Sequence, residues 1–325
     1  MMIGRVSISP LMCAVILVGL STLWVVLEPL GWVAALASHW RLHVALAAMG
    51  VGLWAAGRRR WSWFFAMMLS GGLLLHPVIP EFRGLNSAPR AKGGETSRPS
   101  LKVLSLNVHM TQRHFGGVDE LLALEKPDLV MLVEVDQGWI EGLEASLEAY
   151  PHRYESPRSD FLGLAIYSRR PLRTPAISHP GGPDGPVMAV GVQVGDVWTR
   201  VALVHGLPPI RPDWSHSQRQ LFEGLAATIS RAPGPYLVCG DFNATPWSSP
   251  FKEFRLGADL LHSRGGSLPP GTWPTWVPSA MRIPIDHCLV SREWRVNRYE
   301  LGDSVGSDHL PVVVELSLQD PNDGS

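Results

Sequence analysis

Short apolar runs that end in polar residues constrain the fold of this chain most strongly. Between residues 101 and 316, eight runs rich in Val, Leu and Ile are six to nine residues long. Runs of this length predict β-strands, and amphipathic stretches between some of them predict helices. The strands are expected at residues 101–108, 128–135, 162–168, 186–194, 197–205, 235–240, 285–290 and 310–316, and the clearest helices at 117–124 and 215–230. Many strands with few helices predict an α/β fold in which two packed sheets are flanked by helices.

Polar side chains gather at the ends of these predicted strands. They are Asn107, Glu134, His205, Asp241, Asn243, Asp286, Asp308 and His309. A carboxylate beside an apolar run is costly to bury unless it is paired, hydrogen-bonded or bound to a cation. Oxygen ligands from Asp, Glu and Asn, without thiolates, favour a hard divalent ion. The set therefore predicts a Mg²⁺ or Mn²⁺ site.

Each of these residues also has a purely structural interpretation. Asp241 and Asn243 could form a turn ahead of Pro246, and His205 taken alone is typical of a hydrogen-bonded core histidine. Glu134 is harder to explain in this way, because it directly follows an apolar run. The joint occurrence of these residues at strand ends favours one shared site.

The first 80 residues contain three long stretches without charge. Residues 6–27, 42–57 and 61–80 are 22, 16 and 20 residues long. A helix needs about 20 apolar residues to cross a bilayer core ~30 Å thick. We expect residues 1–80 to form a membrane anchor with about three transmembrane helices, of which the middle one is the weakest.

Charge placement suggests an orientation for this anchor. The cluster Arg58-Arg59-Arg60 favours the cytoplasmic side, so three spans would place the rest of the chain outside the cytoplasm. The expected localisation is the inner or plasma membrane, with an extracytoplasmic catalytic domain. If the middle stretch does not cross, this argument fails. Residues 81–100 read as a flexible linker, residues 101–318 as the catalytic domain and residues 319–325 as a disordered tail.

Charge and cysteine content exclude some classes of protein. The first 100 residues carry nine Lys and Arg against three Asp and Glu, and the remainder carries 19 against 26. A net acidic domain does not favour a protein that coats nucleic acid through basic side chains. Cys13, Cys239 and Cys288 have no zinc-type spacing and suggest no disulfide framework.

The order of the polar residues resembles a known family. Asn107, Glu134 and His205 are followed by GDFN at 240–243, IDH at 285–287 and SDH at 307–309. This order resembles the endonuclease/exonuclease/phosphatase (DNase I-like) superfamily over residues 101–316. With the apolar segments ahead of it, the layout resembles a membrane-anchored bacterial subgroup. The resemblance implies a four-layer α/β sandwich and metal-dependent hydrolysis of phosphoesters.

The resemblance also implies roles for individual residues. Metal ligation is implied for Asn107, Glu134 and Asp308. Catalytic roles are implied for His205, Asp241, Asn243, Asp286 and His309. Asp286 would hold His309, Asp241 would position or deprotonate the attacking water, and Asn243 would hold phosphoryl oxygens. His205 would contact the phosphate or protonate the leaving oxygen.

Two further residues are candidates for substrate binding beside Asn243 and His205. Arg219 lies where relatives place an arginine on the helix after the histidine loop, although it could be structural. Trp273 precedes the IDH motif and could line a substrate rim, while packing of its loop is an equal alternative.

The sequence thus predicts a membrane-anchored, Mg²⁺- or Mn²⁺-dependent phosphoesterase. Its substrate could be nucleic acid, a phospholipid headgroup or a small phosphoester, its anchor would contact the lipid bilayer, and no obligate protein partner is evident. Val133 precedes Glu134 where the DNA-repair branch of the superfamily usually has Gln, which argues against abasic-site repair. The alternative is a non-catalytic, membrane-tethered binding module that retains the sandwich. Because every matched polar position is filled, the enzyme is the favoured hypothesis.

Overall fold

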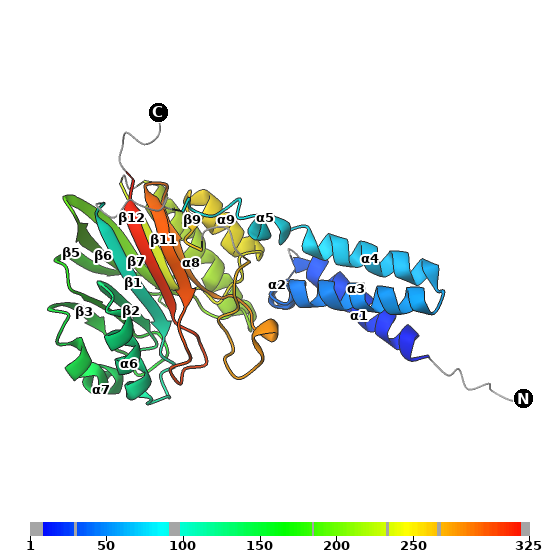
Figure 1. The fold of residues 1–325 in the computed structure, drawn as a ribbon, viewed down its shortest axis with the longest axis horizontal. Coiled ribbons are helices and arrows are strands. Elements are labelled where there is room, and N and C mark those ends of the chain that lie inside the picture. Colours follow the sequence, from blue (N-terminus) through cyan, green and yellow to red (C-terminus); the bar gives the residue numbers. More distant parts are fainter. Residues whose placement is uncertain are drawn as a thin grey trace, which may run out of the picture. The chain divides into compact units, whose positions relative to one another are not determined.

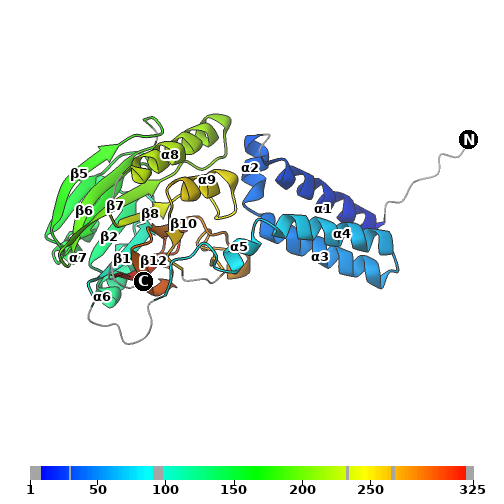
Figure 2. The ribbon, with the colours of Figure 1, turned by 90° about the horizontal axis from the view of Figure 1, so that it is seen from above.

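The computed structural model describes residues 9–28, 31–90, 98–183, 185–231, 234–264 and 268–319. The chain divides into two compact units between Pro80 and Glu81, and Trp247–Ser249 group with the first unit. The first unit is helical, and the second contains the strands, as Figures 1 and 2 show.

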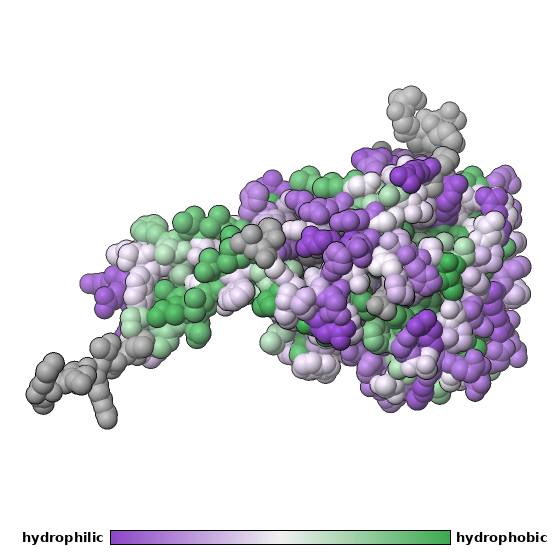
Figure 3. Space-filling view, turned by 180° about the vertical axis from the view of Figure 1, so that it is seen from behind, coloured by the Kyte–Doolittle hydropathy of each residue, from purple (hydrophilic) through white to green (hydrophobic). Residues whose placement is uncertain are grey.

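The first unit consists of short apolar helices. They are α1 (Pro10–Val26), α2 (Trp32–Ser38), α3 (Arg41–Gly57) and α4 (Trp61–Leu75). Ser9 caps α1 by accepting a hydrogen bond from the amide of Met12, and a proline at the first helical position suits this start. Val25, Ala45 and Leu74 form a small buried cluster. Many large apolar side chains nevertheless remain exposed, and Figure 3 shows hydrophobic residues gathered over this unit.

These helices are shorter than two of the predicted membrane spans. α1, α3 and α4 contain 17, 17 and 15 residues. α4 ends at Leu75, shortly before Pro77, because a proline disfavours helical geometry in the residue that precedes it. Residues 6–8 of the first predicted span lie outside the described residues. Within the described ranges, no helix combines the length and the apolar character that crossing a membrane requires, so the transmembrane prediction has no support in the structure.

The second unit is built on two six-stranded mixed sheets. The first sheet has the order β11-β12-β1-β2-β4-β3 and the second β5-β6-β7-β8-β10-β9. The strands of the first sheet are β1 (Ser100–Asn107), β2 (Leu129–Val133), β3 (His152–Ser156), β4 (Leu164–Ser168), β11 (Trp294–Leu301) and β12 (Val312–Leu318). Those of the second sheet are β5 (Leu172–Ser178), β6 (Val187–Val194), β7 (Val197–His205), β8 (Tyr236–Asp241), β9 (Leu261–His262) and β10 (Asp286–Val290).

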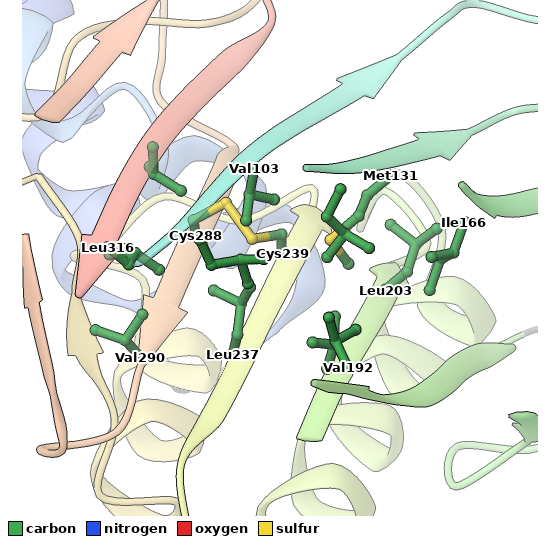
Figure 4. Packing of buried hydrophobic residues seen from close by; sticks show 14 of the residues in the cluster. Val103, Met131, Ile166, Val192, Leu203, Leu237, Cys239, Cys288, Val290 and Leu316 are labelled. Carbon is green, nitrogen blue, oxygen red and sulfur yellow. A yellow bond between two sulfur atoms is a disulfide. The ribbon is translucent and has the colours of Figure 1, made fainter. Parts of the chain in front are cut away.

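Helices cover the outer faces of both sheets. α6 (Phe115–Glu125) and α7 (Gln137–Leu147) pack on the first sheet, and α8 (Pro212–Ser230) and α9 (Ser249–Gly257) pack on the second. A third apolar cluster lies between the sheets and includes Val103, Met131, Leu203 and Leu237 (Figure 4). The structure also contains two short helices, α5 (Ile79–Phe82) and η2 (Ser279–Met281). The predicted α/β architecture of two packed mixed sheets flanked by helices is therefore confirmed.

A disulfide between two neighbouring strands of the second sheet corrects one expectation. Cys239 on β8 and Cys288 on β10 lie directly opposite each other and are bonded (Figure 4). The sequence suggested no disulfide, and that interpretation was wrong for this pair. Its partners are 49 residues apart in sequence, so only the pairing of their strands brings them together.

The predicted flexible linker also differs from the structure. Residues 81–90 pack on the second unit: Glu81 forms a buried ion pair with Arg264, and Ala88 belongs to the cluster between the sheets. The composition of this segment did not reveal these buried contacts. Residues 91–97 of the predicted linker and 320–325 of the predicted tail lie outside the described residues.

Each sheet has one parallel pair of strands near its centre. β1 pairs with β2 in the first sheet, and β7 pairs with β8 in the second, while the other pairings are antiparallel. The carboxyl ends of parallel neighbours lie at one edge, so each pair brings two strand-end residues together. These two edges carry the residues that the sequence singled out.

Candidate active site

The two parallel pairs supply the main groups of the site. Asn107 is the last residue of β1, and Glu134 directly follows β2. His205 ends β7 opposite Asp241, which ends β8. Asp241 also faces Asp286, the first residue of β10. Strand pairing alone therefore places four of the predicted residues in two adjacent pairs.

Unusual backbone geometry occurs beside these strand ends. Gly240 has φ 141°, and a Cβ atom there would lie 1.9 Å from the carbonyl oxygen of Val204, so only glycine fits directly before Asp241. His109, Glu134 and Asn243 have φ values of 56°, 63° and 47°. Positive φ is uncommon outside glycine and often marks functional sites. Three such residues at one edge support the assignment of this edge as the site.

The amide of Asn107 connects the carboxylates of the two sheets. Its Nδ2 donates hydrogen bonds to Glu134 Oε1 at 2.8 Å and to Asp241 Oδ2 at 3.1 Å. Its Oδ1 accepts a hydrogen bond from the backbone amide of His109 at 2.8 Å. Asn107 therefore fixes the relative positions of two acidic groups 107 residues apart in the chain.

Two histidines lie close to the same carboxylate oxygen of Asp241. Asp241 Oδ2 lies 3.7 Å from His205 Nε2 and 3.7 Å from His309 Nε2. His309 Nδ1 is 2.9 Å from Asp286 Oδ2, and because a carboxylate can only accept, Nδ1 carries the proton. Asn243 donates its backbone amide to Asp241 Oδ1 at 2.8 Å. These residues, which the sequence predicted as catalytic, thus form one buried network.

The buried network shifts the pKa values of its members. Burial and the neighbouring Asp286 carboxylate raise the pKa of Asp241 to about 6. Burial works against a charged His309, but the carboxylates of Asp286 and Asp241 outweigh it and raise the pKa of His309 to about 10. His309 is therefore an imidazolium at neutral pH. The carboxyl group of Asp241 titrates within about one pH unit of neutrality. A strongly perturbed acid and base in contact are typical of active sites.

The donor groups fit a hard divalent cation. Donor atoms of Asp241, Asp286 and His309 lie within 4.8 Å of one another, but the sequence predicted these three as catalytic residues and not as metal ligands, and Asp286 and His309 already bind each other. The predicted ligand Asp308 has a buried Oδ1 that makes no hydrogen bond to the described residues. Buried carboxylate oxygens without partners are costly, and a cation would satisfy them. The oxygen-rich set matches Mg²⁺ or Mn²⁺ better than softer metals.

Sequence reasoning missed Gln218, which ties two loops of the site together. Its Nε2 donates to the carbonyl oxygens of Leu207, Phe242 and Asn243 at 2.9, 3.2 and 3.1 Å. A signal was available, because Gln218 falls on the same helical face as Leu221 and is a polar residue on a buried stripe. The predicted neighbour Arg219 is half-buried, and in the described part of the chain no hydrogen bond or ion pair joins it to the site.

Trp273 lies beside the predicted metal ligand. Its indole Nε1 donates a hydrogen bond to Asp308 Oδ2 at 3.0 Å, and its ring centroid lies 6.4 Å from that of His309. Ser307 supports the same loop, since its hydroxyl donates to the carbonyl of Asn107 and accepts from the amide of His309. The structure therefore brings Trp273 into the site through a polar contact as well as its ring.

The buried histidine of the IDH motif should make the stability of the fold sensitive to acid. His287 Nε2 is 2.9 Å from the carbonyl of Ala244, and burial lowers the pKa of His287 to about 4. Between pH 6.5 and 4 the unfolded chain binds a proton there and the folded chain does not. The free energy of unfolding should therefore decrease as the pH is lowered through this window. His287 accounts for about 3 kcal/mol of this decrease.

Chemical denaturation at pH 7 and pH 5 measures this effect. His287→Gln should show a shallower loss of unfolding free energy than the wild type, whereas His216→Gln, at an exposed position, should not change the slope. Equal slopes for the wild type and His287→Gln would contradict the assignment.

Together, the fold and the arrangement of acids, amides and histidines define a two-sheet α/β sandwich with a cluster of polar residues at its strand ends. Residues 104–309 match the model of the Endonuclease/Exonuclease/phosphatase family. The chain belongs to this family, whose members are generally metal-dependent phosphoester hydrolases.

Solved structures share the fold at low sequence identity. The catalytic domain of human Nocturnin with bound sulfate is 19% identical, with a TM-score of 0.58, over 68% of this chain and 96% of that chain. A family protein from Bacteroides thetaiotaomicron is 17% identical, with a TM-score of 0.58, over 69% and 100%. D. rerio TDP2 in complex with a single-strand DNA product is 18% identical, with a TM-score of 0.57, over 67% and 99%. A comparison with curated proteins returned no significant match.

Proposed function

We propose that this protein is a Mg²⁺- or Mn²⁺-dependent phosphoesterase whose site lies at the facing ends of the two sheets. The observation that carries the proposal is the position of Asp241. Its carboxylate is buried, is linked to Glu134 through Asn107, and lies between His205 and His309. Phosphoryl transfer depends mainly on positioning and on neutralising charge, and this arrangement supplies both.

Each of these residues would have a different role in hydrolysis of a bound phosphoester. Asp241, with a pKa raised to about 6, would orient the attacking water and accept its proton. His309 is held by Asp286 and carries a positive charge, so its Nε2 would donate to a phosphoryl oxygen. His205 would protonate the leaving oxygen or contact the phosphate. Asn243 already donates Nδ2 to Gly206 and Asp241, and its Oδ1 can only accept, so the predicted contact of Asn243 with phosphoryl oxygens requires Nδ2 to change its partner.

Glu134 and Asp308 would hold the metal ion, with Asn107 placing the Glu134 carboxylate. When bound, a divalent ion supplies positive charge to the phosphoryl oxygens and lowers the pKa of water. The amide of Asn107 is engaged with both carboxylates, so it is best placed to orient ligands.

Hydrolysis assays with the full chain test the proposal. The substrates should include bis(p-nitrophenyl) phosphate, p-nitrophenyl phosphate, plasmid DNA, sphingomyelin and inositol phosphates, each with Mg²⁺, with Mn²⁺ and with EDTA. We expect metal-dependent release of product from at least one of them. Failure on all substrates, with the protein folded, would favour the alternative of a non-catalytic binding module that retains the sandwich.

We also propose that the helical unit holds the protein at the inner or plasma membrane, with the catalytic unit outside the cytoplasm. Leu17, Leu53, Phe65 and Leu69 each expose more than 60% of their surface, which is unusual for large apolar side chains in water. The disulfide between Cys239 and Cys288 supports an oxidising compartment, because cytosolic thiols are normally kept reduced. α1, α3 and α4 are apolar around most of their circumference, and helices of that kind are normally buried in protein or in lipid.

Cell fractionation and a reporter fusion after Ser100 test this localisation. The full chain should sediment with membranes and resist high salt, and the reporter should be active only outside the cytoplasm. Recovery of the chain in the soluble fraction would refute membrane attachment, and a cytoplasmic reporter signal would refute the orientation.

A further inference from the structure

We infer that Trp273 is a positioning residue for the metal centre: its indole N–H holds Oδ2 of Asp308 so that Oδ1 stays available to the cation. The inference rests on the proposed metal-dependent function. The sequence suggested that Trp273 lines a substrate rim, which requires only its ring. The structure gives the indole nitrogen a separate partner, at 3.0 Å from Asp308 Oδ2.

The loop that carries Trp273 is attached to the loop that carries Asp308. The backbone amide of Thr275 donates to the carbonyl of Asp308 at 2.9 Å, and its hydroxyl donates to the carbonyl of Ser307 at 2.9 Å. On the other side, the amide of Leu310 donates to the carbonyl of Thr272 at 2.9 Å. The indole contact therefore acts within a fixed frame, and its loss should change the carboxylate before it changes the backbone.

Trp273 is itself fixed by the strand-like segment behind it. Its backbone exchanges hydrogen bonds with Ile283 in both directions, at 3.1 and 2.7 Å, and Thr272 Oγ1 accepts from the amide of Asp286 at 3.2 Å. The same short segment thus contacts both Asp308 and the strand that starts with Asp286. These hydrogen bonds hold the backbone that carries the indole in one orientation relative to Asp308.

The two oxygens of Asp308 have different surroundings. Oδ2 receives the indole N–H, whereas Oδ1 is shielded from solvent and makes no hydrogen bond within the described residues. Oδ1 lies 3.9 Å from Nδ1 of His109, which is equally shielded and has no hydrogen-bond partner in the same ranges. Buried polar atoms without partners are rare because each costs free energy, and two of them facing each other point to a bound ion or water.

His109 is held in place for this arrangement. Its backbone has φ 56°, and its amide donates to Oδ1 of Asn107. Asn107 in turn contacts Glu134, the principal metal ligand of the proposed function. The pair of unpartnered atoms therefore lies next to the proposed ligands and belongs to the same site. Groups that orient metal ligands commonly matter as much as the ligands themselves.

Metal binding by Trp273→Phe tests the inference. Phenylalanine keeps an aromatic ring near His309 and lacks the N–H donor, although its ring is smaller than the indole. Trp276→Phe is the matched control, because Trp276 lies in the same loop and exposes 77% of its surface. Binding of Mn²⁺ to the full chain without substrate is measured from the electron paramagnetic resonance signal of the free ion, and folding is checked by circular dichroism.

We expect Trp273→Phe to weaken Mn²⁺ binding by about 10-fold to 100-fold, while Trp276→Phe binds as the wild type does. Hydrolysis by Trp273→Phe should then need more Mg²⁺, and kcat should recover when Mg²⁺ is raised. Unchanged Mn²⁺ affinity in a folded Trp273→Phe would overturn the inference, and a raised KM alone would assign Trp273 to substrate contact. If the wild type itself bound no Mn²⁺, the proposed metal centre would fail together with the inference.

A double variant provides an independent test that does not depend on the stability of one protein. Asp308→Asn removes the carboxylate on which Trp273 acts. In that background, Trp273→Phe should cause no further loss of Mn²⁺ affinity. Additive losses would show that Trp273 affects the metal by another route and would overturn the inference.

Discussion

Replacing Asp241 by asparagine should lower kcat by about 10²–10⁴-fold, because the change removes the group that accepts a proton from water. The side chain is 1% exposed and keeps nearly its shape, so the fold should survive. Steady-state hydrolysis of the substrate identified in the screen, at saturating Mg²⁺, measures this effect.

Asp259→Asn is the matched control for this variant. Asp259 forms an exposed ion pair with Arg292 and no contact with the site residues in the described chain, so its replacement should leave kcat unchanged. Wild-type turnover by a folded Asp241→Asn would exclude Asp241 from the chemistry. Activity would then have to be assigned to another base.

Glu134→Gln should remove most of the metal-dependent activity, on the order of 10³-fold at fixed Mg²⁺, since a direct ligand contributes several kcal/mol of charge stabilisation. Metal binding should report the loss without any substrate. A ligand that binds only the folded protein raises its stability, so Mg²⁺ should raise the Tm of the wild type and not that of Glu134→Gln.

Glu141→Gln tests whether loss of any nearby charge is enough. Glu141 is exposed on α7, where it accepts a hydrogen bond from Gln137. This variant should keep both the Mg²⁺-dependent shift in Tm and the wild-type rate. A Mg²⁺ response of Glu134→Gln equal to that of the wild type would place the metal elsewhere.

The sequence predicted the central strands well and the outer ones not at all. All eight predicted strands occur within a few residues of their expected bounds, whereas β3, β5, β9 and β11 were missed. These four strands are the edges of the two sheets. An edge strand is buried on fewer sides, so it carries polar residues such as those of HRYES in β3 and lacks the apolar run that marks an inner strand.

The sequence predicted which polar residues form the site, but not the hydrogen bonds that join them. A polar residue at the end of an apolar run is visible in the sequence, and Asn107, Glu134, His205 and Asp241 were found in this way. The contact between Trp273 and Asp308 joins residues 35 apart through a loop, and no local pattern indicates it. Gln218 could have been found, because a polar residue on a buried helical face requires partners.

In the helical unit, uncharged runs predicted that helices form but not how long they are. Long uncharged stretches predicted spans, but a run without charge does not set the points where a helix begins and ends. Pro77 follows α4 closely and shortens this helix relative to its apolar run.

Asp241 and Glu134 are carried by different sheets, so packing between the sheets can affect the distance between their carboxylates. No strand pairing joins β2 to β8, so the separation of the two carboxylates depends on the apolar layer between the sheets as well as on the Asn107 amide that bridges them. Apolar side chains of that layer, such as Met131 and Leu237, thereby act as spacers between the two carboxylates (Figure 4). Repacking of that layer offers a way to alter catalysis without touching any polar group.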